Sequence, residues 1–219
     1  MNGAEDSPGL ETGESEENLN DLLKKAGLKP VDEATAGKFG AYLALLLRWN
    51  QRMNLTGIRD AAGIMQRHFV ESIACAQLLP PGIAALLDFG SGAGFPGIPI
   101  ALCRPDIAVT LAESQTKKAA FLQEAVRTLG LRVEVFAGRA EGLDRAFDCV
   151  AMRAVDRMDR AVGSASKLVR PGGWLCLLTT HEELAGVKRA AGNGFEWLPP
   201  VDLPGSQRLV IEIGQKAAR

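Results

Sequence analysis

The sequence predicts an α/β protein with a doubly wound, mostly parallel sheet, an N-terminal helical layer and a C-terminal antiparallel hairpin. Three observations support this fold class. From residue 84 onwards, short apolar runs alternate with segments of helical periodicity. A cluster of four glycines lies within residues 90–97, where the first strand would turn into a helix. Near the C-terminus, two apolar runs flank Pro204-Gly205 with no room for a helix between them.

The N-terminal region differs from the rest in charge. Residues 1–23 carry seven acidic side chains and no basic one, so the remaining 196 residues, with 25 basic and 19 acidic side chains, have a net charge of +6. We divide the chain into an acidic tail (1–17) that we expect to be disordered, a helical layer (18–80) and an α/β domain (81–219). A moderately basic body is compatible with a polyanionic partner.

Helical periodicity predicts three helices in the N-terminal layer, over residues 19–26, 33–53 and 60–79. Gly27 ends the first, Asp32 caps the second, and a Pro-Pro-Gly turn ends the third. Beyond them, apolar runs predict strands at 84–89, 107–112, 132–136, 147–152 and 174–179. Helices are predicted at 97–103, 115–130 and 158–169, with Ser114 as a cap of the second.

The composition excludes several classes of protein. No apolar stretch reaches the roughly 20 residues of a membrane span, and the N-terminus lacks the features of a signal peptide, so we expect a cytoplasmic protein with no membrane partner. The four cysteines are far apart in the sequence and lie in apolar contexts, which predicts buried, reduced thiols. With only two histidines, we expect no metal site, and we interpret His68 as mainly structural, beside an Arg67–Glu71 pair.

The segment DFGSGAGFPG, from Asp88 to Gly97, carries the strongest chemical signal. In a doubly wound sheet, such a loop presents backbone N–H groups and a helix N-terminus to a ligand. A phosphate-binding P-loop is excluded because isoleucine follows Gly97, and a dinucleotide loop is disfavoured because its glycine pattern would begin four residues after Asp88. An acid, an apolar residue and G-x-G-x-G match the third alternative, an S-adenosylmethionine site with Asp88, Gly90 and Gly92 in its loop.

Acidic residues follow the next two predicted strands. Glu113 ends the second strand, where a carboxylate can accept hydrogen bonds from both ribose hydroxyls of that cofactor. Ala140 and Glu141 follow the third strand, where the adenine edge would lie. The alternative is that Glu113 and Glu141 are surface acids.

With these residues in place, the sequence resembles the glucose-inhibited division protein B family, now called ribosomal small-subunit RNA methyltransferase G. The resemblance rests on DFGSGAGFPGIP at 88–99 and covers roughly residues 19–213. The other segments that agree are RWNQRMNLTGIRD (48–60), RHFVES (67–72), ESQTKKAAFL (113–122), GRAEGL (138–143), MRAV (152–155) and QRLVIEI (207–213).

The resemblance implies a Rossmann-like class I S-adenosylmethionine-dependent methyltransferase fold. It implies methyl transfer from S-adenosyl-L-methionine to N7 of one guanine, G527, in 16S ribosomal RNA or the assembling small subunit. It also implies cofactor contacts at Gly90, Phe95, Ala140, Glu141 and Arg153.

Two departures from the family concern the C-terminal strands. Relatives often have a lysine and a glycine where Leu178-Thr179-Thr180 stands here, and lysines where Glu212 and Gly214 stand. These departures weaken the expectation of RNA contacts at that edge.

The residues themselves agree with N7 as the methylated atom. MRAV at 152–155 lacks the Asp/Asn-Pro-Pro-aromatic segment that would hold an amino group, and Cys149 and Cys176 lie inside predicted strands. Guanine N7 carries a lone pair and no proton, so it needs alignment rather than a general base.

Basic residues around the predicted site are candidates for ligand contacts. Arg153 could hold the cofactor carboxylate or guanine O6, or instead pair with Asp156 at the surface. The candidates for RNA contact are Arg67, Lys117, Lys118 and Arg139, with Arg48, Arg52, Arg59, Arg157 and Arg160 as further candidates for backbone contacts. The alternative functions are a methyltransferase acting on a small molecule or protein, a nicotinamide-dependent reductase, and an RNA-binding module with an inactive cofactor site.

Overall fold

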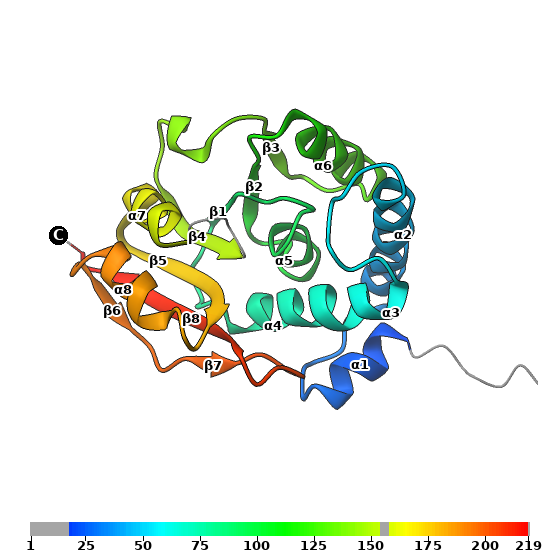
Figure 1. Ribbon diagram of the computed structural model, residues 1–219, viewed down its shortest axis with the longest axis horizontal. Helices are drawn as coiled ribbons and strands as arrows, with labels where there is room; N and C mark the ends of the chain where they lie inside the picture. The colour runs from blue at the N-terminus through cyan, green and yellow to red at the C-terminus, as the bar shows by residue number, and fades with distance from the viewer. Residues whose placement is uncertain (1–17, 154–157, 219) are drawn as a thin grey trace, which may run out of the picture.

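Within residues 18–153 and 158–218, which the computed structural model describes, eight strands form one sheet (Figure 1). Its order is β3-β2-β1-β4-β5-β8-β6, and β7 pairs with β8. The strands are β1 (Ala85–Phe89), β2 (Ala108–Ala112), β3 (Glu134–Phe136), β4 (Phe147–Arg153), β5 (Val169–Thr180), β6 (Phe195–Trp197), β7 (Val201–Asp202) and β8 (Leu209–Lys216). Strands β1 to β5 pair in parallel, whereas β8 is antiparallel to β5, β6 and β7. The doubly wound, mostly parallel sheet with an antiparallel C-terminal end is confirmed.

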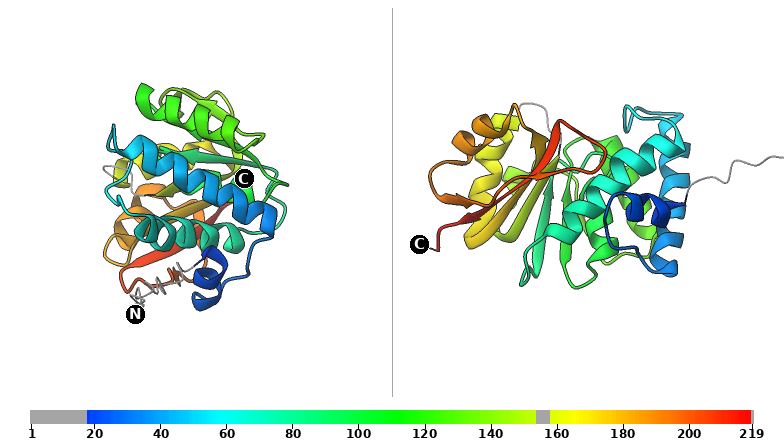
Figure 2. Two further views of the ribbon diagram at one scale, coloured as in Figure 1. Left: turned by 90° about the vertical axis from the view of Figure 1, so that its right-hand side faces the viewer. Right: turned by 90° about the horizontal axis from the view of Figure 1, so that it is seen from below.

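Helices cover both faces of this sheet (Figure 2). On one face lie α4, α5 and α6, with α1 and α2 packed outside them, and on the other face lie α7 and α8. The helices are α1 (Leu19–Lys25), α2 (Glu33–Asn50), α3 (Ala61–Gly63), α4 (Val70–Leu78), α5 (Gly97–Cys103), α6 (Thr116–Thr128), α7 (Met158–Leu168) and α8 (Leu184–Ala191), with a π-helical turn η1 (Ile64–Phe69) and a 3-10 turn η2 (Ala140–Gly142).

Alternate residues of the central strands face opposite helical layers. In β4, Cys149 and Ala151 join the apolar cluster beneath α4, α5 and α6, whereas Val150 and Met152 join the cluster beneath α7 and α8. Because both faces are buried, these strands are mostly apolar and do not alternate between apolar and polar residues. The carboxyl ends of the parallel strands are left as the edge where a ligand can bind.

The segment from Ala61 to Leu78 is helical throughout but not uniform. After α3, the turn η1 is π-helical, and the Val70 N–H donates to the Met65 carbonyl, five residues earlier. The sequence predicts a helix here but not this wider turn. Phe69, at the end of η1, packs on Phe39 and Tyr42 of α2, with ring centroids 5.1 and 5.4 Å apart, so the turn is anchored to the rest of the helical layer.

The structure also differs from the expected elements at other places. Helix α2 ends at Asn50, three residues early, and the N-cap of α6 is Gln115 with no side-chain hydrogen bond, so Ser114 does not cap it. Strand β5 begins at Val169 rather than at 174, because Val169 pairs with Phe147 across a register shift. Helix α8 was not predicted.

The cysteines are free thiols, and Cys75, Cys149 and Cys176 are buried as expected, whereas Cys103 is half-buried. Two of these cysteines, although far apart in the sequence, are in contact. The Sγ atoms of Cys75, on α4, and Cys176, on β5, lie 3.4 Å apart, where the helical layer meets the sheet.

Candidate functional site

Asp88 holds the glycine loop between β1 and α5 from beneath. Its side chain is fully buried, and Oδ2 accepts a hydrogen bond of 3.0 Å from the Gly97 N–H at the start of α5. The Ser91 hydroxyl donates to the Asp88 carbonyl at 3.0 Å. Burial raises the pKa of Asp88 to about 7. We expected Asp88 to contact a cofactor, but the carboxylate fixes the shape of the loop and does not line the pocket described below.

Gly90, Gly92 and Gly94 of this loop all have left-handed backbones, and the surroundings of Gly92 and Gly94 differ. Gly92 has φ 58° and Gly94 has φ 95°. A Cβ on Gly94 would lie 2.6 Å from Ile98 Cδ1 and 2.7 Å from Tyr42 Oη, so packing leaves room only for glycine at this position. A Cβ on Gly92 would meet no atom closer than the Gly90 carbonyl oxygen, at 3.9 Å. The absence of a side chain at Gly92 therefore leaves open space beside the loop.

Glu113, at the end of β2, ties the glycine loop to the next strand–helix turn. Its side chain is buried, Oε2 accepts from the Gly92 N–H at 2.9 Å, and Oε1 accepts from the Gln115 N–H at 2.7 Å. An ionised carboxylate has about four acceptor positions, so both oxygens can still accept from a ligand. The surface-acid alternative for Glu113 does not agree with this burial, whereas Glu141 is exposed at the pocket rim.

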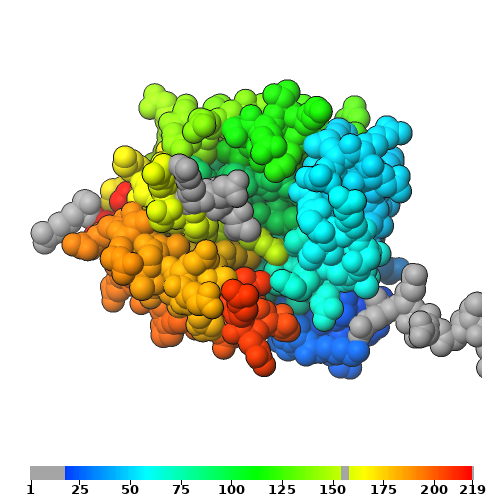
Figure 3. Space-filling view, viewed as in Figure 1, coloured from blue at the N-terminus to red at the C-terminus, as the bar shows by residue number. Residues whose placement is uncertain are grey.

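A pocket of about 850 Å³ lies above the carboxyl ends of the parallel strands, within the size range of small-molecule sites. Figure 3 shows the surface hollowed between the cyan N-terminal layer and the green segments around β2 and α6. The residues that line it include Leu55, Thr56, Gly57, His68, Gly90, Gly92, Phe95, Glu113, Lys118, Arg139, Ala140, Glu141, Arg153 and Arg160.

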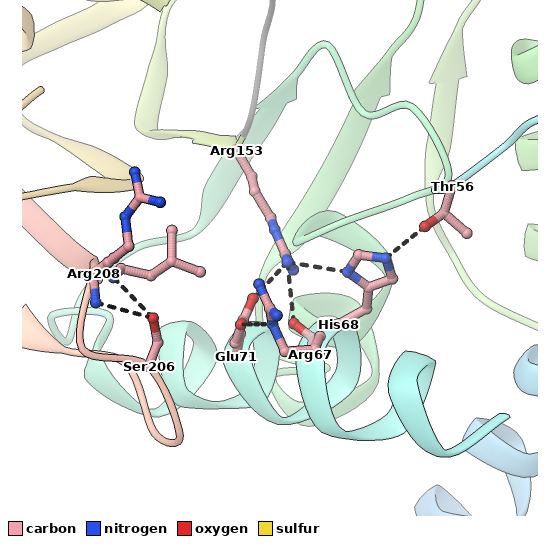
Figure 4. A network of polar contacts seen from close by, with 8 residues as sticks. Thr56, Arg67, His68, Glu71, Arg153, Ser206 and Arg208 are labelled. Carbon is pink, nitrogen blue, oxygen red and sulfur yellow. Dashed lines mark hydrogen bonds and ion pairs between the residues drawn. The ribbon is translucent and has the colours of Figure 1, made fainter. Parts of the chain in front are cut away.

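Arg153, at the end of β4, reaches into the helical layer (Figure 4). Its Nη2 atom lies 2.5 Å from Glu71 Oε2, 3.0 Å from His68 Nδ1 and 3.0 Å from the Arg67 carbonyl oxygen. The side chains of Arg153 and Glu71 are 13% and 1% exposed, so this is a buried ion pair. The other terminal nitrogen, Nη1, is buried and has no hydrogen-bond partner in the described chain. The alternative pairing with Asp156 lies outside the described residues.

His68 links this ion pair to the loop after α2. Its Nε2 atom lies 2.6 Å from Thr56 Oγ1, and its ring stacks on Phe95 of the glycine loop with a centroid distance of 4.7 Å. Burial and the charges of Arg153 and Arg67 lower the pKa of His68 to about 3. His68 is therefore a neutral group at the pocket, with a larger part in the site than the sequence suggested.

The structure brings together most of the predicted cofactor-site residues. Apart from Asp88, all of them line the pocket: Gly90, Gly92, Phe95, Glu113, Ala140, Glu141 and Arg153. Of the predicted RNA contacts, Lys118 and Arg139 line it, whereas Lys117 is exposed beside it and Arg67 lies outside it, where it pairs with Glu71 at 3.2 Å. Arg157 lies outside the described residues.

Sequence reasoning missed Thr56 and undervalued His68. Both belong to the segments that carry the family resemblance, which was the available signal, but nothing local shows that residues 56, 68 and 153 meet. Their contact depends on how the helical layer docks on the sheet.

Packing explains the second of the two departures from the family, at Glu212 and Gly214. Glu212 is fully buried and forms an ion pair of 3.0 Å with Lys188 of α8. A Cβ on Gly214 would lie 2.6 Å from the Trp197 ring. Both positions face the interior, not a partner.

Among the described residues, no helix is long and apolar enough to cross a membrane. The same part of the chain has no group of three His, Cys, Asp or Glu side chains placed to hold a metal ion.

Comparison with known sequences gives strong matches. The model of a family described as rRNA small subunit methyltransferase G matches residues 35–192. A protein of that name from Xanthomonas oryzae pv. oryzae is 42% identical over 188 residues, which cover 83% of this chain and 88% of the relative. One from Stenotrophomonas maltophilia is 42% identical over 181 residues, covering 80% of this chain and 84% of the relative.

Comparison with solved structures supports the fold alone, because the identities are low. A methyltransferase from Pyrococcus furiosus superposes with a TM-score of 0.60 at 16% identity, over 82% of this chain and 100% of the other. The P. horikoshii protein TYW2, solved in complex with MeSAdo, superposes with a TM-score of 0.52 at 16% identity, over 67% of this chain and 61% of the other.

Proposed function

The chain belongs to the rRNA small subunit methyltransferase G family, and from that membership we propose that it transfers a methyl group from S-adenosylmethionine to N7 of a guanine in 16S rRNA. The target that the resemblance implies is G527. The observation that carries the proposal is the pocket at the carboxyl edge of the sheet, which joins the glycine loop to Glu113 and to Ala140-Glu141.

The residues present fit this cofactor. A Cβ would project into the open space beside Gly92, and a buried carboxylate stands at the end of β2, where two hydroxyl groups can donate to it. Gly90, Gly92 and Phe95 would bound the cofactor on one side, Glu113 would hold the ribose, and Ala140-Glu141 would meet the adenine. Arg153, whose Nη1 atom has no hydrogen-bond partner among the described residues, is the group that would hold the carboxylate of the cofactor. Asp88 would not contact the cofactor; its hydrogen bonds to Ser91 and Gly97 hold the glycine loop in shape.

When bound, S-adenosylmethionine supplies an electrophilic methyl group. The protein's own part is positioning, because guanine N7 needs no deprotonation before it attacks. The lining agrees with this chemistry, since the histidine at the pocket is a weak base with a pKa of about 3. Lys118, Arg139 and Arg160, at the pocket and its rim, would contact RNA phosphates and orient the loop that carries the base.

Titration calorimetry of the full chain tests the cofactor. We expect S-adenosylmethionine and S-adenosylhomocysteine to bind with a stoichiometry of about one and NADH not to bind. Binding of NADH alone would favour the reductase alternative.

Replacing the buried carboxylate sharpens that test. Glu113→Ala should lower the affinity for S-adenosylhomocysteine by roughly 1.5–3 kcal/mol, the range for hydrogen bonds to a charged group. Glu134→Ala, which removes a carboxylate of β3 that pairs with Arg145 and lies outside the pocket, serves as the matched control and should bind normally. Equal affinities in the two variants would contradict the assignment.

The substrate is tested by mapping the product. The enzyme and S-adenosylmethionine are incubated with small subunits, or with their RNA, from cells that lack this methylation, and the RNA is cleaved by reduction and aniline at N7-methylated guanine. A single cut at one small-subunit guanine is expected. Incorporation at another atom, or none despite tight cofactor binding, would overturn the proposal and favour a small-molecule or protein substrate.

A further inference from the structure

Thr56 lies on a rigidly held loop at the pocket. The side chain of Asn50, buried at the end of α2, accepts from the Leu55 N–H at 2.9 Å and the Thr56 N–H at 3.2 Å. Its amide nitrogen donates to the carbonyls of Thr56 and Ile58, at 3.2 and 3.1 Å. Four hydrogen bonds to one buried side chain fix the backbone around Thr56, which lines the pocket between Leu55 and Gly57.

The neighbouring histidine has one tautomer. A guanidinium group is a donor only, so His68 Nδ1, which is 3.0 Å from Arg153 Nη2, carries no proton. Arg153 Nη2 carries two hydrogens, and its neighbours are His68 Nδ1, Glu71 Oε2 and the Arg67 carbonyl oxygen. A proton on Nδ1 would face these hydrogens, so two donors would oppose each other. His68 is neutral, so its one proton sits on Nε2 and is donated to Thr56 Oγ1 at 2.6 Å (Figure 4).

The hydrogen bonds that the Thr56 hydroxyl accepts leave it able only to donate to a ligand. A hydroxyl oxygen has two acceptor positions. One receives the His68 Nε2–H and the other the Ile58 N–H, at 3.1 Å. The hydroxyl hydrogen itself has no acceptor in the part of the chain that the structure describes. With both acceptor positions occupied, the hydroxyl can serve a ligand in the pocket only by donating its hydrogen.

We propose that Thr56 is a specificity-determining residue that donates a hydrogen bond to O6 of the target guanine and so selects guanine over adenine. This inference rests on the proposed function. Guanine presents two acceptors on the edge that contains N7, N7 and O6, and methylation of N7 leaves O6 as the acceptor beside the reacting atom. Adenine presents an amino group in place of O6, which would face a hydroxyl that cannot accept from it.

The pocket leaves room for this arrangement. Glu113 and Ala140-Glu141 lie beyond the ends of β2 and β3, where the cofactor nucleoside would bind. Thr56 lies on the N-terminal layer, joined through His68 to Arg153 at the end of β4. A base placed at this end meets the Thr56 hydroxyl and the Phe95–His68 stack, both held before the substrate arrives.

The test combines a change in the protein with a change in the base. Thr56→Val removes the hydroxyl at nearly constant shape, and Thr56→Ser retains it. Each protein is assayed on small-subunit RNA that carries, at the target position, either guanine or 2-aminopurine, which keeps N7 and the 2-amino group but lacks O6. The readouts are the single-turnover rate of N7 methylation and the affinity for S-adenosylhomocysteine.

We expect the wild-type protein and Thr56→Ser to methylate guanine faster than 2-aminopurine, and Thr56→Val to lose roughly tenfold of that preference, the size of one neutral hydrogen bond. Cofactor affinity should be unchanged. A variant that was merely misfolded would lose rate on both bases and keep the ratio. An unchanged ratio in Thr56→Val, or a loss confined to cofactor affinity, would overturn the inference. Failure of the wild-type protein to methylate guanine N7 would instead contradict the proposed function.

Discussion

At one end of the pocket, the groups that face a ligand are backbone atoms of the glycine loop and the carboxylate of Glu113. At the other end they are the side chains of Arg153, His68 and Thr56, each from a different element. The first end is joined by a contact between residues 21 apart in the sequence, Gly92 and Glu113, whereas Arg153 and His68 are 85 residues apart. One end belongs to a single β-α-β unit, and the other exists only when the helical layer is docked on the sheet.

This difference teaches that the two ends can be damaged separately. A change in the helical layer should act on docking and on the end that holds Thr56, His68 and Arg153, where the base and the cofactor carboxylate would bind. A change in the glycine loop should act on the end that would hold the cofactor nucleoside. The variants below test that separation.

The largest effect is expected at the ion pair that joins layer to sheet. Glu71→Gln leaves the Arg153 guanidinium buried without its carboxylate, with Arg67 nearby, and should lower the free energy of unfolding by about 3–5 kcal/mol in urea denaturation. The double variant Glu71→Met, Arg153→Met should be more stable than Glu71→Gln, since it leaves no uncompensated charge. If the single substitution costs no more than a surface pair, under about 1 kcal/mol, the layer is not held by this contact.

Gly92, in the glycine loop, and Gly97, at the start of α5, should respond differently to substitution by alanine. In Gly97→Ala the new Cβ would overlap Leu111 Cδ2 and lie 2.6 Å from Asp88 Oδ2, so we expect a loss of about 1–3 kcal/mol of stability from overpacking. In Gly92→Ala the Cβ enters open space, so beyond the roughly 1 kcal/mol of strain from its positive φ the loss should appear in cofactor affinity. Circular dichroism melts and calorimetry separate the two, and normal cofactor binding by Gly92→Ala would remove that face of the loop from the site.

A pH titration should isolate His68. Its folded-state pKa of about 3 lies below the ordinary 6.5, so the unfolded chain binds the proton first and stability is lost as pH falls from 6.5 towards 3. Between pH 6.5 and 5 the loss should be roughly 1.5–2 kcal/mol, and it should be absent in His68→Gln. Asp88, with its pKa raised to about 7, has the opposite slope but is present in both proteins and cancels in their difference. Parallel curves for the two proteins would show that His68 is not held neutral.

The smallest effect is expected at the rim. Lys118 lines the pocket and Lys117 points to solvent beside it. Lys118→Ala should reduce the slope of log affinity for RNA against log salt by about one, as for the loss of a phosphate contact. Lys117→Ala should change it less. Equal effects would place the RNA along the α6 face rather than over the pocket.

The sequence predicts the cofactor end well because its signals are local. The acid and glycines at 88–94, and the carboxylate that ends β2, lie beside turns that their own residues specify. Even there, the burial of Asp88 was not predicted, because a motif gives residue identities and not which atoms face a ligand.

The end that holds Arg153, His68 and Thr56 could not be predicted, because its contacts join residues far apart in the sequence. Whether Arg153 pairs with Glu71 or with a sequence neighbour depends on the docking of α4, which no periodicity reveals. The role of His68 follows from its partners, Arg153 and Thr56, and the Cys75–Cys176 contact arises in the same way. Long-range contacts of single side chains leave no repeat in the sequence.

The π-helical turn of η1 has a consequence for how this end tolerates change. An α-helix advances about 100° per residue, so one residue more or fewer within a turn rotates everything on one side of it against the other. Arg67 and His68 lie in this turn, and Glu71 lies in the first turn of α4, which follows it. The directions of these three side chains therefore depend on the number of residues between Asp60 and Val70, and not only on which residues these are. A one-residue deletion there could leave the segment helical, but it would rotate these side chains away from Arg153 and Thr56. No substitution at a single position would restore their directions.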